Sequence, residues 1–196
     1  LHKYGGIWID SSTILTDSFK WLHNKNSTAF GYYIKKFTTN KNYPVIESWF
    51  IASTSTNEFI NAWFKEFDYA CKKFNNDGNA YLMELKQLYG PDKYNALVHN
   101  IESPDYLTIH MAAQKIMQIN NIKPYMCDIA EEGPFKLLTK LGWDHTKMGE
   151  YLCIPNTDTD LPNIIKLRGG ERDSLIKYLE KNAPSKDSIY DRYLGL

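Results

Sequence analysis

The sequence lacks a surplus of charge of either sign, a disulfide framework and a long apolar run. Lys and Arg together number 23, as do Asp and Glu. This balance argues against nonspecific binding to nucleic acid or to an anionic membrane, which needs excess positive charge. No apolar run approaches the ~20 residues of a membrane-spanning helix. The three cysteines, Cys71, Cys127 and Cys153, are odd in number and far apart. They indicate a reducing compartment, and so a cytoplasmic protein without disulfides or a zinc site.

Several common catalytic motifs are also absent. The sequence contains no G-x-x-x-x-G-K-[ST], G-x-G-x-x-G, H-E-x-x-H or G-x-S-x-G. These absences argue against the commonest nucleotidases, dehydrogenases, zinc proteases and serine hydrolases. The 196 residues are 43% hydrophobic and 23% charged, as in a folded soluble protein. We therefore expect a single domain over residues 1–196.

Short apolar segments alternate with helical patterns along the chain, which predicts the α/β class. A buried strand is expected at 7–9, and a capping box at Ser55–Glu58 predicts the start of a helix. Residues 168–170 are predicted to form a loop. The other predicted strands are 29–35, 44–52, 122–127, 151–154 and 163–167, and the predicted helices are 55–75, 80–89, 93–99, 103–120, 133–141 and 171–181.

The most informative segment is Tyr4–Ser12, which reads Y-G-G-I-W-I-D-S-S. Two glycines, Gly5 and Gly6, precede the predicted strand and would let the backbone come close to a ligand. Asp10 directly follows the strand and could hold Mg²⁺ or Mn²⁺ through oxygen. Such a cation would bridge the two phosphates of a nucleotide-sugar. An ordinary strand that ends in a polar turn explains the same residues, and on composition alone it is favoured.

The opening segment LHKYGGIWIDSSTILT closely resembles the signature of the capsular polysaccharide synthesis proteins, which are sugar transferases related to glycosyltransferase family 32. Later segments are similar to further elements of the family, in the same order: ESWFIAS with NEFINAWF, DYLTIHMAAQKI, EEGPF and IIKLRG. The resemblance covers most of the chain. It implies the GT-A fold, an α/β fold that binds nucleotide-diphospho-sugars.

The resemblance also implies an incomplete domain. Family members carry a nucleotide-binding half before the Y-G-G segment, which here begins at Tyr4. We therefore expect an N-terminally truncated fragment, the C-terminal portion of a GT-A domain. The family's D-x-D pattern reads Asp10-Ser11-Ser12 here, so its second carboxylate is missing. The Ser12 hydroxyl would then join Asp10 as a metal ligand.

The function that the resemblance implies is a metal-dependent hexosyltransferase of the retaining type. It would move a sugar from a UDP- or GDP-linked donor to a polysaccharide or glycolipid acceptor in bacterial capsule or surface polysaccharide synthesis. Mn²⁺ or Mg²⁺ would be the cofactor. Nucleic acid is not an expected partner, and peripheral association with the inner face of the membrane stays open.

Three carboxylates are candidate catalytic residues: Asp10, Glu47 and Asp105. Glu47 lies in a predicted strand, where a buried carboxylate must be paired or reactive. Asp105 lies at a predicted helix start, where capping the helix is an equal alternative. His110, on the apolar side of that helix, is expected to be a hydrogen-bonded core histidine rather than a substrate contact.

The expected donor-binding residues lie at both ends of the chain. Lys166 and Arg168 flank a glycine pair and could reach a diphosphate, although a solvated basic edge is an equal alternative. Tyr4 and Trp8 are expected to support the site by packing. The full donor-binding set is Tyr4, Gly5, Gly6, Asp10, Ser12, Lys166 and Arg168.

Two functions other than sugar transfer stay open. A non-catalytic remnant or sugar-binding partner could keep the fold, and the missing second carboxylate favours that alternative. A glycoside hydrolase would need two carboxylates ~5–9.5 Å apart across the scissile bond. The sequence marks no such pair, so the hydrolase is the weakest of the three.

Overall fold

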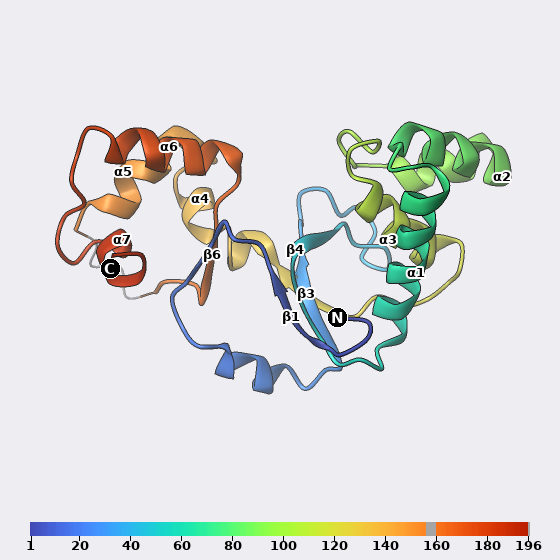
Figure 1. Cartoon of the computed structure of the whole chain (residues 1–196), viewed down its shortest axis with the longest axis horizontal. Coiled ribbons are helices and arrows are strands. Elements are labelled where there is room, and N and C mark those ends of the chain that lie inside the picture. Colours follow the sequence, from blue (N-terminus) through green and yellow to red (C-terminus); the bar gives the residue numbers. More distant parts are fainter. Residues whose placement is uncertain (156–159, 196) are drawn as a thin grey trace. The chain divides into compact units, whose positions relative to one another are not determined.

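The computed structural model describes residues 1–155 and 160–195. The chain divides into two compact units, the first formed by Leu1–Ile9 with Lys25–Ile129 and the second by Asp10–Asn24 with Ala130–Leu196. Figure 1 labels the helices α1 to α7 and the strands β1, β3, β4 and β6. Both units combine helices with strands, which confirms the mixed α/β class.

The first unit is built on a mixed four-stranded sheet in the order β1-β4-β3-β5. Its strands are β1 (Gly6–Ile9), β3 (Ala29–Tyr33), β4 (Ile46–Ser53) and β5 (Met126–Ile129). β4 pairs antiparallel with β1 and β3, whereas β3 and β5 are parallel. The strand predicted at 7–9 exists, but its predicted burial is wrong. Ile7 is 38% and Trp8 56% exposed, because β1 is an edge strand that pairs with β4 alone.

Three helices complete the first unit: α1 (Glu58–Lys73), α2 (Gly78–Val98) and α3 (Thr108–Gln118). α1 starts later than the predicted capping box, because the Asn57 side chain accepts a hydrogen bond from the Ile60 N–H at 3.0 Å. The predicted break after residue 89 is confirmed by the non-helical backbone of Gly90. The predicted start of α3 at Ser103 is wrong. Ser103 has a φ of 51°, so the chain turns there and becomes helical only at Thr108.

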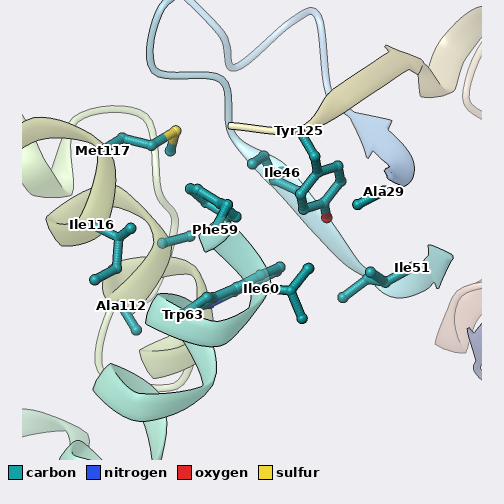
Figure 2. Packing of buried hydrophobic residues seen from close by; sticks show 11 residues of the cluster. Ala29, Ile46, Ile51, Phe59, Ile60, Trp63, Ala112, Ile116, Met117 and Tyr125 are labelled. Atoms are coloured by element: carbon teal, nitrogen blue, oxygen red, sulfur yellow. The ribbon is translucent and has the colours of Figure 1, made fainter. Parts of the chain in front are cut away.

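The core of the first unit lies between its sheet and the helices α1 and α3 (Figure 2). Trp63 of α1 is 4% exposed, and its indole N–H donates to the Ile109 carbonyl at 2.7 Å. This polar contact lets the large ring be buried without loss of a hydrogen bond. The buried cluster consists of Ala29, Ile46, Ile51, Phe59, Ile60, Trp63, Ala112, Ala113, Ile116, Met117 and Tyr125.

The second unit has a two-stranded antiparallel sheet of β2 (Thr13–Leu15) and β6 (Ile164–Lys166). Its α-helices are α4 (Lys136–Lys140), α5 (Met148–Cys153), α6 (Gly169–Leu179) and α7 (Ile189–Tyr193). Its 3₁₀ segments include Ala130–Glu132 and His145–Lys147. A further 3₁₀ segment, Phe19–Lys25, ends at Lys25, which is counted with the first unit.

Two local predictions for the second unit are wrong. The strand predicted at 151–154 is the helix α5, since a short apolar run does not distinguish a strand from a buried helix. The close approach of α5 to α6 requires Gly149, where a Cβ atom would lie 2.3 Å from the Ser174 carbonyl oxygen. The loop predicted at 168–170 is also shorter than expected, because α6 already begins at Gly169.

Candidate functional site

The pairing of β2 with β6 places Lys166 beside the residues that follow β1. Thr13 lies opposite Lys166 in the register, and the Leu167 N–H donates to the Ser12 carbonyl at 2.9 Å. The Lys166 ammonium consequently lies 2.9 Å from Asp10 Oδ2 and 2.5 Å from Ser12 Oγ. We call Asp10, Ser12 and Lys166 the lysine–aspartate cluster.

Burial in this cluster is unequal. The Lys166 side chain is 7% exposed, whereas that of Asp10 is 41% exposed. A buried ammonium group is costly unless an opposite charge and hydrogen bonds compensate it, and Asp10 and Ser12 provide both. The solvated basic edge considered for Lys166 is therefore not what the structure shows.

The EEGPF segment, which the resemblance singled out, adjoins the lysine–aspartate cluster. The Lys166 N–H donates to the Pro134 carbonyl at 3.0 Å. The next residue, Phe135, packs with Trp143, and the Arg168 guanidinium lies 5.2 Å from the centre of the Trp143 ring. Segments near residues 10, 134 and 166, which the resemblance singled out separately, thus meet within the second unit.

Arg168 is held by Glu171, a residue that the sequence analysis missed. Arg168 Nε and Nη2 donate to the two Glu171 carboxylate oxygens at 3.0 and 2.9 Å, and its backbone N–H donates at 2.8 Å. The Glu171 side chain is 1% exposed. Burial acts to raise the pKa of Glu171, but the hydrogen bonds and charge of Arg168 outweigh it and lower the pKa. The R-x-x-E spacing before a helix was the signal that could have identified this pair.

The residues at Asp10 do not fit a divalent cation. Mg²⁺ and Mn²⁺ prefer several oxygen ligands with negative charge. The lysine–aspartate cluster offers one carboxylate and one hydroxyl, and both contact the Lys166 ammonium. Within residues 1–155 and 160–195, no group of three or more His, Cys, Asp or Glu side chains is placed to hold a metal. The metal role of Asp10 and Ser12 stays a prediction that this arrangement does not support.

The other two candidate carboxylates belong to the first unit. Glu47 of β4 is half-buried and accepts a hydrogen bond from the Trp49 indole N–H. Asp105 is exposed and precedes α3 by a turn, so capping this helix is not its role. Its backbone carbonyl instead accepts from the Thr108 hydroxyl at 3.1 Å. Their catalytic roles stay predictions.

The glycines before β1 have a structural reason within the first unit. Gly5 has a φ of 69°, and a Cβ atom there would lie 2.7 Å from the Ser53 carbonyl oxygen. Gly6 has a φ of 105°, with open space where its Cβ would lie. Gly5 is thus explained by its contact with the end of β4, whereas Gly6 is explained by its backbone conformation alone.

Tyr4 does not have the packing role expected for it, whereas Trp8 is packed in part. Tyr4 is 81% exposed, and Trp8 is 56% exposed on the edge strand. Trp8 lines an apolar cavity of about 380 Å³ together with Trp63 and Phe64. Donor binding by Tyr4 stays a prediction.

His110 is buried, as predicted, but the hydrogen bonds expected for it are incomplete. Its Nδ1 finds no partner among the residues that the structure describes. Burial lowers the pKa of His110 from 6.5 to about 4, because the apolar surroundings disfavour the charged ring. His110 is therefore a neutral core residue near pH 7.

A second ion pair that the sequence analysis missed lies at the end of β5. The Lys25 ammonium contacts the Asp128 carboxylate and lies 4.8 Å from the centre of the Phe30 ring. Asp128 pairs with Tyr32 in the parallel register, and burial together with the Asp128 charge raises the pKa of Tyr32. Asp128 directly follows the strand predicted at 122–127, as Asp10 follows the strand predicted at 7–9, and this position was the signal that could have identified it.

None of the helices among the described residues is long and apolar enough to cross a membrane. A search of curated proteins finds no match, and neither does a search of solved structures. Residues 1–90 match the family model described as capsular polysaccharide synthesis protein. The match contains the Y-G-G segment, Asp10 and the segments of β4 and α1, and it does not extend to the later similar segments. Over residues 1–90, the resemblance to the capsular polysaccharide synthesis proteins is therefore confirmed.

Proposed function

We propose that this chain is part of a sugar transferase of capsular polysaccharide synthesis. It would move a sugar from a nucleotide-diphospho-sugar, UDP- or GDP-linked, to a saccharide or glycolipid acceptor. The family match over residues 1–90 supports a role in capsular polysaccharide synthesis. The proposal of transfer chemistry depends on the lysine–aspartate cluster, where three separate segments of the resemblance converge.

The charges of the second unit suit a nucleotide-sugar donor. The partly exposed carboxylate of Asp10 can accept hydrogen bonds from hydroxyl groups of a sugar, because ionised carboxylates only accept. Breaking the bond between the sugar and the diphosphate leaves negative charge on the departing oxygens. Fixed positive groups stabilise such charge without reorganisation. Lys166 contacts Asp10, and Arg168 follows Lys166 by two residues and is held by Glu171.

The finer parts of the proposal follow from the resemblance. We propose on this ground the GT-A fold, the retaining outcome and catalytic roles for Glu47 and Asp105. The same holds for contacts of Tyr4, Gly5 and Gly6 with the donor. We further propose that residues 1–196 act as one domain in the cytoplasm.

A transfer assay tests the proposed function. The gene product that contains residues 1–196 is incubated with UDP- and GDP-sugars and with saccharide acceptors, and both transfer and nucleoside diphosphate release are measured. We expect turnover with at least one donor and a loss of about a hundredfold in Asp10→Asn, equivalent to ~2.7 kcal/mol of transition-state stabilisation. Asp173→Asn, an exposed carboxylate on α6, is the matched control and should keep full activity.

The same assay separates the enzyme from a sugar-binding protein. If nucleotide-sugars bind in calorimetric titrations but no transfer or hydrolysis occurs with any donor, the chain is a binding module and the transferase proposal is wrong. Equal turnover in the wild type and in Asp10→Asn would likewise show that the cluster is not the site of transfer.

A further inference from the structure

The cation beside the Asp10-Ser11-Ser12 motif is a lysine of the same chain. Asp10 Oδ2 and Ser12 Oγ, the two oxygens expected to bind a metal, both contact the ammonium group of Lys166. The backbone of Lys166 is also fixed, since it pairs with β2 and its N–H donates to the Pro134 carbonyl. Because the Lys166 side chain is 7% exposed, its position is set by the fold and not by solvent.

A divalent cation at Asp10 would compete with this lysine. At Asp10 Oδ2 and Ser12 Oγ the two cations would need the same oxygens. At the other carboxylate oxygen their positive charges would still repel each other at short range. A metal would also draw these two oxygens away from an ammonium whose side chain is 7% exposed. A buried ammonium that loses its counter-ion is unfavourable because of desolvation.

We propose that the Lys166 ammonium takes the place of a divalent cation at the Asp10-Ser11-Ser12 motif, so that ligand binding there requires no metal ion. Lys166 is a positioning residue in this arrangement. It neutralises part of the Asp10 charge and fixes one of its carboxylate oxygens, which leaves the partly exposed carboxylate to accept hydrogen bonds from a hydroxylated ligand.

A catalytic role of Lys166 rests on the proposed function. If the chain transfers sugars, the lysine supplies positive charge that a metal ion would otherwise supply beside the donor. We then expect that EDTA changes the transfer rate by less than twofold. The lysine replaces only the positive charge of a metal ion, because an ammonium group cannot coordinate several phosphate oxygens as a metal does.

Binding of Mn²⁺ itself tests the proposal without any assumption about activity. Titrations of the whole chain with MnCl₂, followed by electron paramagnetic resonance of free Mn²⁺, compare the wild type with Asp10→Asn. The affinity of these two should agree within twofold, since Asp10 is already occupied by the lysine. Lys166→Glu puts a second carboxylate beside Asp10 and should bind Mn²⁺ at least tenfold more tightly than the wild type. Lys177→Glu, an exposed position on α6, controls for the added charge and should show no such gain.

The results that overturn the proposal are defined by the same titrations. A wild type that binds Mn²⁺ at least tenfold more tightly than Asp10→Asn has its metal at Asp10, and the lysine does not replace it. A folded Lys166→Glu with no gain over Lys177→Glu would show that residue 166 does not adjoin Asp10. If Lys166→Glu fails to fold, the comparison of the wild type with Asp10→Asn still decides. Failure of the transfer assay alone would refute the proposed function and leave these binding results standing.

Discussion

Lys166 Nζ lies 2.9 Å from Asp10 Oδ2, although 156 positions separate the two residues in the sequence. The pairing of β2 with β6 creates this contact, because Thr13 and Lys166 are opposite each other in the register. The carboxylate that most resembles a metal ligand in the sequence is therefore the counter-ion of a buried lysine. This relationship leads to stability predictions that do not depend on any ligand.

Asp10→Asn should destabilise the protein more than Lys166→Met does. Asp10→Asn removes the Asp10 carboxylate charge from beside the buried ammonium, whereas Lys166→Met leaves a carboxylate that is already 41% exposed. Breaking a fully buried ion pair costs about 3–5 kcal/mol, and the exposure of Asp10 reduces this to about 1–2 kcal/mol. Urea unfolding of the two variants measures the difference.

The double variant Asp10→Asn with Lys166→Met supplies the control. It removes both charges, so it should lose less stability than the sum of the two single variants. Additive losses would show that the two side chains do not interact.

Glu171→Gln should change how stability depends on acid. The pKa of Glu171 is lowered below 4.5 in the folded chain, so the unfolded chain takes up the proton first as the pH falls. The stabilisation is therefore present above pH 4.5 and is lost as the pH falls through the lower folded pKa. Thermal melts from pH 7 to pH 3 should show a lower Tm for Glu171→Gln at pH 7 and a smaller further loss toward pH 3. Parallel curves for the two proteins would contradict the pairing with Arg168.

His110 should lower the stability of the folded chain in acid, because charging a buried ring is unfavourable. Its pKa is lowered from 6.5 to about 4 in the folded chain, so the unfolded chain binds the proton more readily between these values. Stability is full above pH 6.5 and falls as the pH is lowered toward 4, by up to about 3 kcal/mol.

A His110→Leu variant cannot bind that proton and should lose less stability over the same interval. The measurement is urea unfolding at pH 7, 5.5 and 4.5. His99→Leu, at an exposed position, is the control and should follow the wild type. If His110→Leu also follows the wild type, the ring is not buried in a neutral state.

Gly5→Ala should destabilise the first unit whether or not a ligand binds near it. The new Cβ would lie 2.7 Å from the Ser53 carbonyl oxygen, at a φ of 69° that side chains rarely adopt. We expect a loss of at least about 1–2 kcal/mol, from the backbone strain and the clash together. Gly169→Ala on α6 is the matched control, because its Cβ would meet no atom closer than 4.0 Å. Equal melting temperatures for both variants would return Gly5 to a role in ligand binding alone.

Several elements could be predicted from the sequence because they depend on near neighbours in the chain. Apolar residues of α1 recur at helical spacing, and Ile60, Trp63 and Ala70 of that predicted face are buried, whereas Phe64 is exposed. The separate helices predicted at 80–89 and 93–99 placed a break between them, and Gly90 is non-helical there. Asp10 was predicted to follow a strand, and it does. In each case the residues that determine the structure lie within a few positions of it.

Other features depend on packing between distant segments, and the sequence did not reveal them. An apolar strand such as Ile7–Ile9 is buried or exposed according to its place in the sheet, and β1 is at the edge. The run at 151–154 lies in the helix α5, which packs closely on α6 at Gly149.

The sequence by itself determined that a carboxylate and two hydroxyl residues follow a short strand, and that a lysine lies in another predicted strand far along the chain. Only the tertiary structure decided that these groups are one ion-paired cluster. The physical reason is that local patterns depend on the backbone of a few adjacent residues. The partner of a buried charge depends instead on which strands pair and in which register, and that choice is made by the packing of the whole unit.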